Sequence, residues 1–179
     1  MKIRRLILIS VWLLLAACGY SHPGARPAAV GAITIQAGTW ENRTNELALE
    51  GLLLQKTGDW LQQARLFHLV ADPEQADYIL SGTIEAVNFP ATAFNANDRA
   101  STLNAWAKVT YRLRARVTGQ TVWEIRGATR ERSFQAADDV VLTRSNREEA
   151  LAVIADELAE QIYLKVLTSL SATVPEPAK

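Results

Sequence analysis

Few side chains of this sequence have the type and spacing that catalysis or metal binding requires. The two histidines, His22 and His68, lie far apart and have no metal-ligand neighbour at a useful spacing. The adjacent acids Asp138 and Asp139 are more typical of a solvated turn than of an acid–base pair. The sequence contains no phosphate-binding glycine loop, no nucleophile elbow and no paired-cysteine motif. We therefore expect no enzyme, no metal site and no cofactor.

The remaining residue with distinctive chemistry is the only cysteine, Cys18. A disulfide needs a second cysteine, so this thiol has another use. Residues 1–17 have the three parts of an export signal: a basic start, an apolar run over 6–15 and the small pair Ala16-Ala17. The apolar run is shorter than the roughly 20 residues of a membrane-spanning helix. We therefore expect a signal peptide that is cut before Cys18.

The stretch Leu15-Ala16-Ala17-Cys18 resembles the bacterial lipobox, at which lipoprotein signal peptides are cut. The resemblance implies that Cys18 is the lipid attachment site and carries acyl chains such as palmitate. Several chains anchor a protein firmly, because each buried methylene contributes about 0.8 kcal/mol. Gly19 stands where aspartate would retain a Gram-negative lipoprotein at the inner membrane, so the resemblance implies an outer-membrane lipoprotein on the periplasmic face. The alternative is a secretory signal with a chance cysteine.

The mature chain has about 160 residues, the size of one domain. The signal removes three of the 19 basic residues, which leaves 16 against 19 acidic ones. A nucleic-acid-binding domain is typically basic, so nucleic acid is not an expected partner. We predict a flexible tether after the acylated cysteine (18–31), a single domain (32–170) and a disordered tail (171–179), because both flanks lack an apolar period and are rich in small residues and proline.

The apolar periods predict an α+β domain: a mostly antiparallel sheet of about four strands with two helices packed on one face. Asn42 or Thr44 is expected to cap the first helix, and Ser145 with Glu148 the second, as a capping box. The inner stripe of the second helix is Leu151, Ile154, Leu158, Ile162, Val166 and Leu170. The expected strands are 32–36, 76–89, 101–117 and 122–134, and 67–70 is a candidate for one more short strand. The expected helices are 45–66 and 145–170, and the expected loops are 90–100 and 136–146.

The pairing of the two long strands decides which side chains share a face. A two-residue turn at Gly119-Gln120 would bring charged residues onto the apolar face. A three-residue loop, 119–121, instead places Val117 opposite Trp123 and keeps that face apolar. A slip of one residue turns every side chain to the other face, so burial favours the three-residue loop.

This register gathers seven basic residues on the sheet face away from the helices, with Glu124 as their main counter-charge. They are Lys108, Arg112, Arg114, Arg116, Arg126, Arg130 and Arg132. Trp106 is expected on the same face, and acidic residues decorate the last helix. Two interpretations stay open: a solvated sheet face, or a ligand-binding face for the phosphates or carboxylates of a partner, which the planar fork of arginine binds in pairs.

Several motifs together resemble the lipopolysaccharide-assembly lipoprotein family (LptE). They are "CGY" at the lipid site, "ENRTNE" before the first helix, "ADYILSGTI" on a strand, the paired long strands and the closing amphipathic helix. The resemblance runs from Cys18 to about Leu170. It implies a non-enzymatic lipoprotein of the Gram-negative outer membrane that plugs the lipopolysaccharide translocon β-barrel, assists cell outer membrane assembly and binds lipopolysaccharide during its transport.

Two rival functions stay open. The first is a periplasmic lipoprotein activator or secretion accessory of a cell-wall synthase or polymer exporter, because such proteins share the "ADY" strand and a similar build. The second is a lipid-tethered enzyme, which the missing catalytic constellation disfavours. The partners expected from the resemblance are the translocon barrel, lipopolysaccharide and the membrane itself through the lipid anchor.

Overall fold

The sheet is organised around its longest strand, β5 (Ala100–Ala115), in which buried and outward-facing residues alternate without interruption from Ala105 to Leu113. The structure is a computed structural model that describes residues 32–171. The predicted signal peptide, Cys18, the tether and the tail from 172 on lie outside the described residues.

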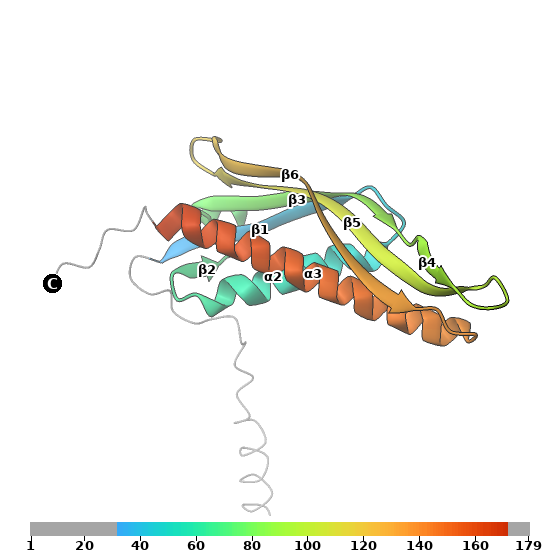
Figure 1. The fold of residues 1–179 in the computed structure, drawn as a ribbon. Coiled ribbons are helices and arrows are strands. Elements are labelled where there is room, and N and C mark those ends of the chain that lie inside the picture. Colours follow the sequence, from blue (N-terminus) through green and yellow to red (C-terminus); the bar gives the residue numbers. More distant parts are fainter. Residues whose placement is uncertain (1–31, 172–179) are drawn as a thin grey trace, which may run out of the picture.

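Six strands form one mixed sheet (Figure 1). Strand β1 (Ile33–Asn42) lies parallel to β2 (Phe67–Leu69) on one side and to β3 (Tyr78–Asn88) on the other. Strand β5 then pairs antiparallel with β3, with the short β4 (Ala91–Phe94) and, on its opposite edge, with β6 (Thr121–Gln135).

The prediction of an α+β domain is confirmed, but that of a mostly antiparallel sheet of about four strands is wrong. The helix after β1 returns the chain to the same end of the sheet, so the next strands run parallel to β1. The predicted loop 90–100 also contains a strand, β4, which extends the β5 edge where β3 ends.

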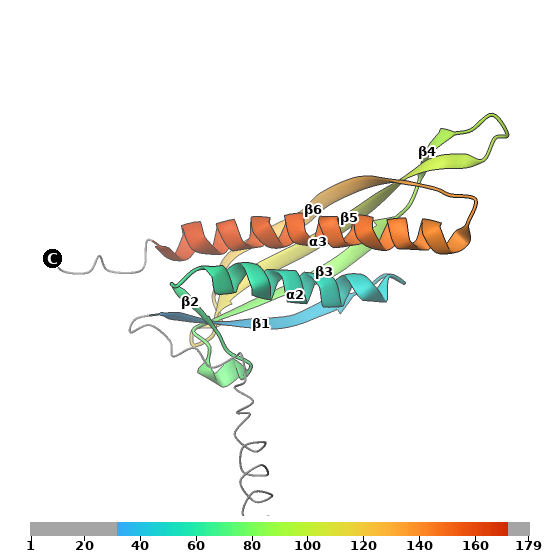
Figure 2. The same cartoon turned by 90° about the horizontal axis from the view of Figure 1, so that it is seen from below.

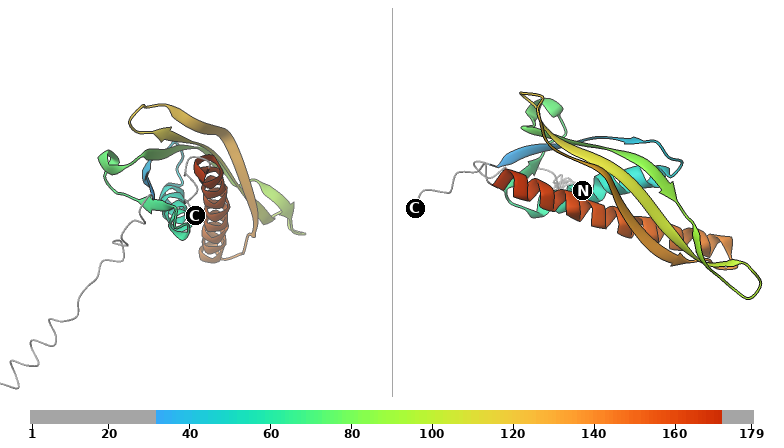
Figure 3. Two further views of the ribbon diagram at one scale, coloured as in Figure 1. Left: turned by 90° about the vertical axis from the view of Figure 1, so that its left-hand side faces the viewer. Right: turned by 45° about the horizontal axis from the view of Figure 1, so that its top comes forward.

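The two helices, α2 (Leu47–Gln63) and α3 (Val140–Leu170), cover one face of the curved sheet (Figure 3). Seen from below, they lie side by side, and the first turns of α3 extend beyond α2 together with β4 (Figure 2). The whole predicted inner stripe of the last helix, from Leu151 to Leu170, is buried in a single core with the inner face of β5. The 3-10 turn Pro73–Gln75 leads from β2 into β3.

Both helix starts differ from the predictions. Helix α3 begins at Val140, where the Asp139 carboxylate accepts a hydrogen bond from the Val141 amide at 2.7 Å, so the capping box at Ser145 and Glu148 is wrong. The apolar period did not predict these first turns because Val140 and Val141 are about three-quarters exposed and do not continue the buried stripe. The predicted loop 136–146 therefore shrinks to a short connection.

Helix α2 begins at Leu47, after Glu46, and has no side-chain cap. The predicted capping residues build the preceding turn instead. The Asn42 side chain accepts hydrogen bonds from the amide and hydroxyl of Thr44, and the Thr44 hydroxyl accepts one from the Glu46 amide. These bonds turn the chain out of β1 toward the helix, as asparagine and threonine do in turns.

The predicted pairing of β5 with β6 is also wrong, although its faces are right near the turn. Trp123 pairs with Leu113 rather than Val117, an offset of four residues. An even offset leaves the side chains of Trp123, Glu124 and Ile125 on their expected faces. Next to the turn the register shifts once more, because Arg114 pairs with Thr121 rather than with Val122. Residues 116–120 connect the strands, and Val117, which was expected in the core, is 80% exposed. The strand stops at Ala115 because a turn closes there, with a bond from the Gly119 amide to the Ala115 carbonyl.

Beyond this region, β6 and β3 each carry one extra residue relative to β5. In β6 the bulge lies between the partners of Tyr111 and Val109, where Gly127 has a φ of +62°. In β3 it lies at Glu85, between the partners of Val109 and Lys108. A bulge reverses the side-chain alternation of the strand that carries it. Ala86 therefore pairs with the outward-facing Lys108, although it lies two residues after the buried Ile84.

A glycine lets an aromatic ring pack flat on the inner face of the sheet. Gly82 of β3 pairs with Trp40 of β1, and a Cβ at this position would collide with the Trp40 ring. The tryptophan is 3% exposed. It thus fills the space that a side chain on Gly82 would need.

We predict that Gly82→Ala lowers the free energy of unfolding by about 1–3 kcal/mol, because it overpacks the core against Trp40. The matched control is Gly51→Ala on an exposed face of α2, where an added Cβ meets nothing within 4 Å. This control should raise the stability by about 1 kcal/mol through helix propensity. Urea unfolding of both variants checks the prediction, and equal effects of the two would contradict it.

Candidate functional site

The face of the sheet opposite the helices contains an open hollow of about 520 Å³. Neutral polar residues of β1 and β3, which include Gln36, Thr39, Ser81 and Thr83, form much of its floor. The charged residues Glu41, Arg43 and Glu124 line it as well. Its wall on the β5 side carries Arg112 and Arg114. The extra residue in β1, at Gly38 and Thr39 opposite Ser81, interrupts the pairing of β1 with β3 at the middle of this floor.

Four of the seven predicted basic residues lie on this outer face. Lys108, Arg112 and Arg114 alternate with the buried residues of β5, and Arg126 follows Glu124 on β6. Trp106 lies on the same face, as predicted, opposite Asn88 and Glu131 rather than within the hollow.

The other three basic residues lie elsewhere. Arg116 follows the end of β5, donates a hydrogen bond from Nε to the Ala76 carbonyl and lies 3.6 Å from the Glu74 carboxylate. Arg130 and Arg132 were predicted on the outer face, and this is wrong. They pair with Ala107 and Ala105, whose side chains are buried on the helix side.

The contacts of the Arg130 side chain show that it lies on the helix side of the sheet. Its Nη2 donates a hydrogen bond to the Gln161 side chain of α3 at 2.9 Å, and its Nε lies 3.8 Å from the Glu157 carboxylate. The cause is the bulge at Gly127, which exchanges the two faces of β6. A prediction that assumes regular alternation along β6 ignores the extra residue at Gly127. It therefore places Arg130 and Arg132 on the wrong face of the sheet.

One hydrogen-bonded network holds both bulges. The Thr110 hydroxyl accepts a hydrogen bond from the Gly127 amide at 2.9 Å and donates one to the Glu85 carboxylate at 2.6 Å. The Lys108 ammonium lies 2.9 Å from the other oxygen of Glu85. The outward side chains of β5 thereby tie the extra residues of β3 and β6 to the same level of the sheet.

Carboxylates neutralise most of the positive charge on this face. Glu41 accepts two hydrogen bonds from Arg43, at 2.9 and 3.0 Å, while Glu124 holds Arg126 at 2.6 Å and Glu85 holds Lys108. The expectation that Glu124 is the main counter-charge is therefore wrong. Within residues 32–171, Arg112 and Arg114 have no carboxylate within ion-pair distance. Both are exposed, so they are the cations of this face that are available to a ligand.

Three further charged residues belong to this face and were not predicted from the sequence: Glu41, Arg43 and Glu85. The first two flank the turn that we interpreted only as a helix cap. Their side chains lie beside Thr83, because β1 pairs with β3 in parallel, which the sequence did not indicate. The position of Glu85 was not predicted because the residue forms the bulge of β3, which the sequence does not reveal. The alternation of Ser81 and Thr83 with Leu80 and Ile84 was a usable signal for an outward polar floor.

The acidic residue of the "ADY" motif has a structural contact. The Asp77 carboxylate accepts hydrogen bonds from the amide and hydroxyl of Thr34 at 2.8 and 2.7 Å, and the Asp77 amide donates to the same hydroxyl. This exchange fixes the start of β3 beside the start of β1.

Other kinds of site find no support in the part of the chain that the structure describes. No three metal-ligating side chains gather between residues 32 and 171. The helices of that part are not apolar over a length sufficient to cross a membrane. His68 lies on the edge strand β2.

The chain matches a known protein family over most of the described domain. Residues 33–166 of the chain match the family model LptE, lipopolysaccharide-assembly, which is more than half of its length. None of the curated proteins compared matches the chain.

Several solved structures are similar to the chain at low sequence identity. A Caulobacter crescentus protein described as a lipoprotein is 22% identical, with a TM-score of 0.51 over 74% of this chain and 90% of that one. A hypothetical protein of Chlamydia trachomatis is 12% identical, with a TM-score of 0.52 over 79% and 99%. A third, PelC from Paraburkholderia phytofirmans, solved as a dodecamer, is 19% identical, with a TM-score of 0.49 over 80% and 91%. At such identities the first two likenesses show the fold alone.

The bulge network predicts an acid-sensitive stability. The hydrogen bond from Thr110, with that from Lys108, lowers the pKa of Glu85, and the bond from Arg43 lowers the pKa of Glu41. A pKa lowered by folding stabilises the protein above its ordinary value of 4.5 and ceases to do so as the pH falls through the lowered value. We predict that Glu85→Gln is less stable than wild type at pH 7 and loses less stability between pH 5 and 3.

Thermal unfolding across this pH range measures the effect. The matched control is Glu160→Gln, an exposed residue of α3 without an ion pair among the described residues. If the Glu85 and Glu160 variants follow the same pH profile, the network does not stabilise the fold.

Proposed function

Because the chain belongs to the LptE lipopolysaccharide-assembly family, we propose that it is an outer-membrane lipoprotein that plugs the lipopolysaccharide translocon barrel and assists its assembly. In this proposal the outer face of the sheet binds lipopolysaccharide during its delivery to the cell surface. The role is that of a non-enzymatic accessory.

The observation that carries the ligand proposal is the unpaired state of Arg112 and Arg114 beside the polar hollow. Neighbouring cations of the same face are already held by carboxylates, as Arg126 is by Glu124. A guanidinium binds phosphate through two parallel hydrogen bonds, and lipopolysaccharide carries phosphorylated sugars. The floor residues around Ser81 offer hydroxyl and amide groups of the size and polarity that sugar hydroxyls bind.

The plug proposal rests on the family and on the character of the surface. Barrel interiors are polar, so a domain inside one needs a polar outer face. The sheet presents such a face on the side that the helices leave uncovered, with hydroxyl, amide and charged groups (Figure 3). The anchor proposal rests on the sequence around Cys18. Strand β1 starts at the end of the domain where α3 finishes, so the tether would enter there (Figure 2).

We predict that the double variant Arg112→Glu, Arg114→Glu binds purified lipopolysaccharide about tenfold more weakly or worse, because two charge-assisted contacts become repulsive. The control is the double variant Arg65→Glu, Arg144→Glu, which makes the same total charge change at two exposed positions away from the hollow and should bind as wild type does. Binding is measured by surface plasmon resonance, with dephosphorylated lipopolysaccharide as a second ligand. Unchanged affinity of the double variant would remove the hollow as the binding site.

We predict that the tagged full chain, pulled down from detergent-solubilised outer membrane, brings a large β-barrel protein with it. Mass spectrometry identifies the partner, and Cys18→Ser should reduce recovery by removing the anchor. Recovery of a cell-wall synthase or of a polymer-export complex would instead favour the activator or secretion-accessory role.

A further inference from the structure

Strand β6 forms one edge of the sheet along its whole length, Thr121–Gln135, because it pairs with β5 alone. It contains no proline. Long unpaired edges invite pairing with another chain, and proteins usually blunt them. The side chains and backbone of β6 therefore show where this edge is closed and where it is open.

The hydrogen bonds of β5 identify which backbone groups of β6 face the open edge. The Asn104 amide bonds to the Pro90 carbonyl, on the side of β5 away from β6. Successive residues of a strand direct their amide and carbonyl groups to opposite sides. Leu103 and Ala105 therefore point to β6, and their partners Phe134 and Arg132 point back. Glu131 precedes Arg132, and Ser133 lies between Arg132 and Phe134. The backbone amide and carbonyl groups of Glu131 and Ser133 therefore face the free edge.

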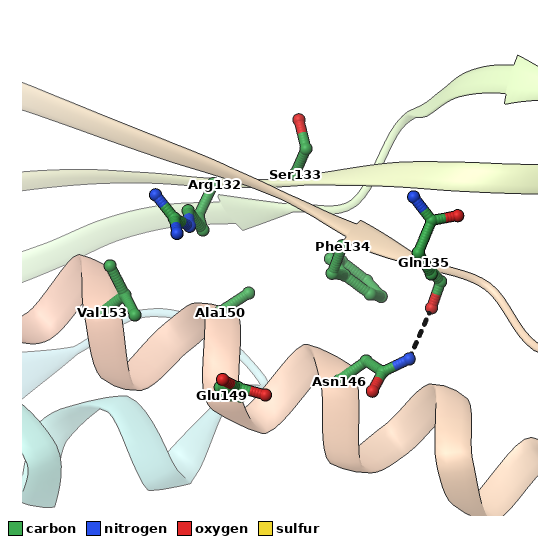
Figure 4. Close-up of a pocket in the computed structure, with 8 residues that line it drawn as sticks. All are labelled: Arg132, Ser133, Phe134, Gln135, Asn146, Glu149, Ala150 and Val153. Carbon is green, nitrogen blue, oxygen red and sulfur yellow. Dashed lines mark hydrogen bonds between the residues drawn. The ribbon is translucent and has the colours of Figure 1, made fainter.

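Side chains close this edge on both sides of the Glu131–Ser133 stretch. The Thr129 carbonyl accepts a hydrogen bond from Nη1 of Arg130 at 2.8 Å. The Gln135 carbonyl accepts one from Nδ2 of Asn146 at 2.9 Å, as Figure 4 shows. Between these two caps, no described residue outside the sheet bonds to the backbone of Glu131 or Ser133. The edge is thus open over a stretch that a short extended segment could cover.

A cavity lies directly beside this open stretch, between β6 and α3 (Figure 4). It measures about 240 Å³. Phe134 extends into it from β6, while Ser133 points to the other side of the sheet. From α3 the apolar Ala150 and Val153 line it, together with the polar Asn146 and Glu149. Arg132 lies at one end and has no carboxylate within ion-pair distance among the described residues.

We propose that the open edge of β6 binds an extended segment of a partner polypeptide as an added antiparallel strand. Main-chain hydrogen bonds to Glu131 and Ser133 hold such a strand, and its alternate side chains select it. The residue opposite Phe134 enters the cavity on the helix side and is apolar, of leucine size. The residue opposite Arg132 shares that side and is acidic, which complements the unpaired guanidinium.

A second copy of this chain fits the edge poorly. If Glu131 of one copy pairs with Ser133 of another, the two Arg132 side chains lie opposite each other on the helix side. Like charges directly opposite in an antiparallel pair are destabilising. The observed charge thus favours a different chain with an acidic residue. The proposal is independent of lipopolysaccharide binding, because the hollow with Arg112 and Arg114 lies on the other face.

The test uses the full chain in detergent and a fluorescein-labelled peptide of sequence Thr-Lys-Thr-Leu-Thr-Glu-Thr-Lys, read by fluorescence anisotropy. We expect saturable binding that Ser133→Pro weakens about tenfold or more, because proline removes an edge amide that contributes to the added strand. The matched control Ser133→Ala keeps that amide and should bind as wild type does. Val153→Phe, which fills the cavity, should also weaken binding.

A charge exchange tests the selectivity. Arg132→Glu should weaken binding of this peptide and restore it when lysine replaces the peptide glutamate. Absence of saturable binding, or equal binding by Ser133→Pro and Ser133→Ala, overturns the proposal. So does a concentration-dependent dimer in light scattering that Ser133→Pro abolishes, since it assigns the edge to a second copy. Lipopolysaccharide binding by Ser133→Pro reports separately on the outer face and should equal that of wild type.

Discussion

The arrangement of this domain depends on the hydrogen bonds that Thr110 makes to both neighbouring strands. Its hydroxyl joins the Gly127 amide of β6 to the Glu85 carboxylate of β3. Strand β5 keeps a regular alternation, while each neighbour carries one extra residue at this level. Gly127 makes the bulge in β6 possible because its φ of +62° is accessible to glycine at little cost. These two bulges determine which side chains of β3 and β6 lie on the outer face of the sheet and which lie on the helix side.

The bulges separate charges that the sequence places in one row. On the side toward the turn, both arginines of β5, Arg112 and Arg114, stay on the outer face and remain without an ion pair beside a polar hollow. On the other side, the arginines of β6 turn toward α3, where Arg130 contacts Gln161 and Arg132 borders a cavity. One strand pair thus supports two different surfaces, a face suited to phosphates and an edge suited to an extended polypeptide.

The sequence predicted those features that depend on burial alone. The stripe from Leu151 to Leu170 and the alternation around Tyr111 follow from apolar periods, and both are buried as expected. The family followed from several motifs together, and two of these have structural roles: Asn42 and Thr44 shape a turn, and Asp77 ties β3 to β1. The outward position of Arg112 and Arg114 followed from alternation within one regular strand.

The remaining features depend on partners distant in sequence. Parallel pairing of β1 with β3 has no local signature, so Glu41 and Arg43 were not placed beside the hollow. A bulge adds one residue to a strand, so every later side chain of that strand changes face. The only local sign of the bulge before Arg130 is Gly127, and a glycine at that position is equally typical of a turn. The first turns of α3 lacked an apolar face because Val140 and Val141 are exposed there. Loop length set the β5–β6 register, and burial alone fixed only its parity.

In the proposed function, the bulge at Gly127 withdraws Arg130 and Arg132 from the ligand face and leaves Arg112 and Arg114 as the ligand-binding cations. The most direct measurement is the NMR shift of the arginine Nε–Hε signals during titration with the soluble phosphorylated disaccharide of the lipopolysaccharide head group. We expect saturating shifts at Arg112 and Arg114 and none at Arg130 or Arg132. Comparable shifts at all four, or shifts confined to Arg130 and Arg132, would contradict it.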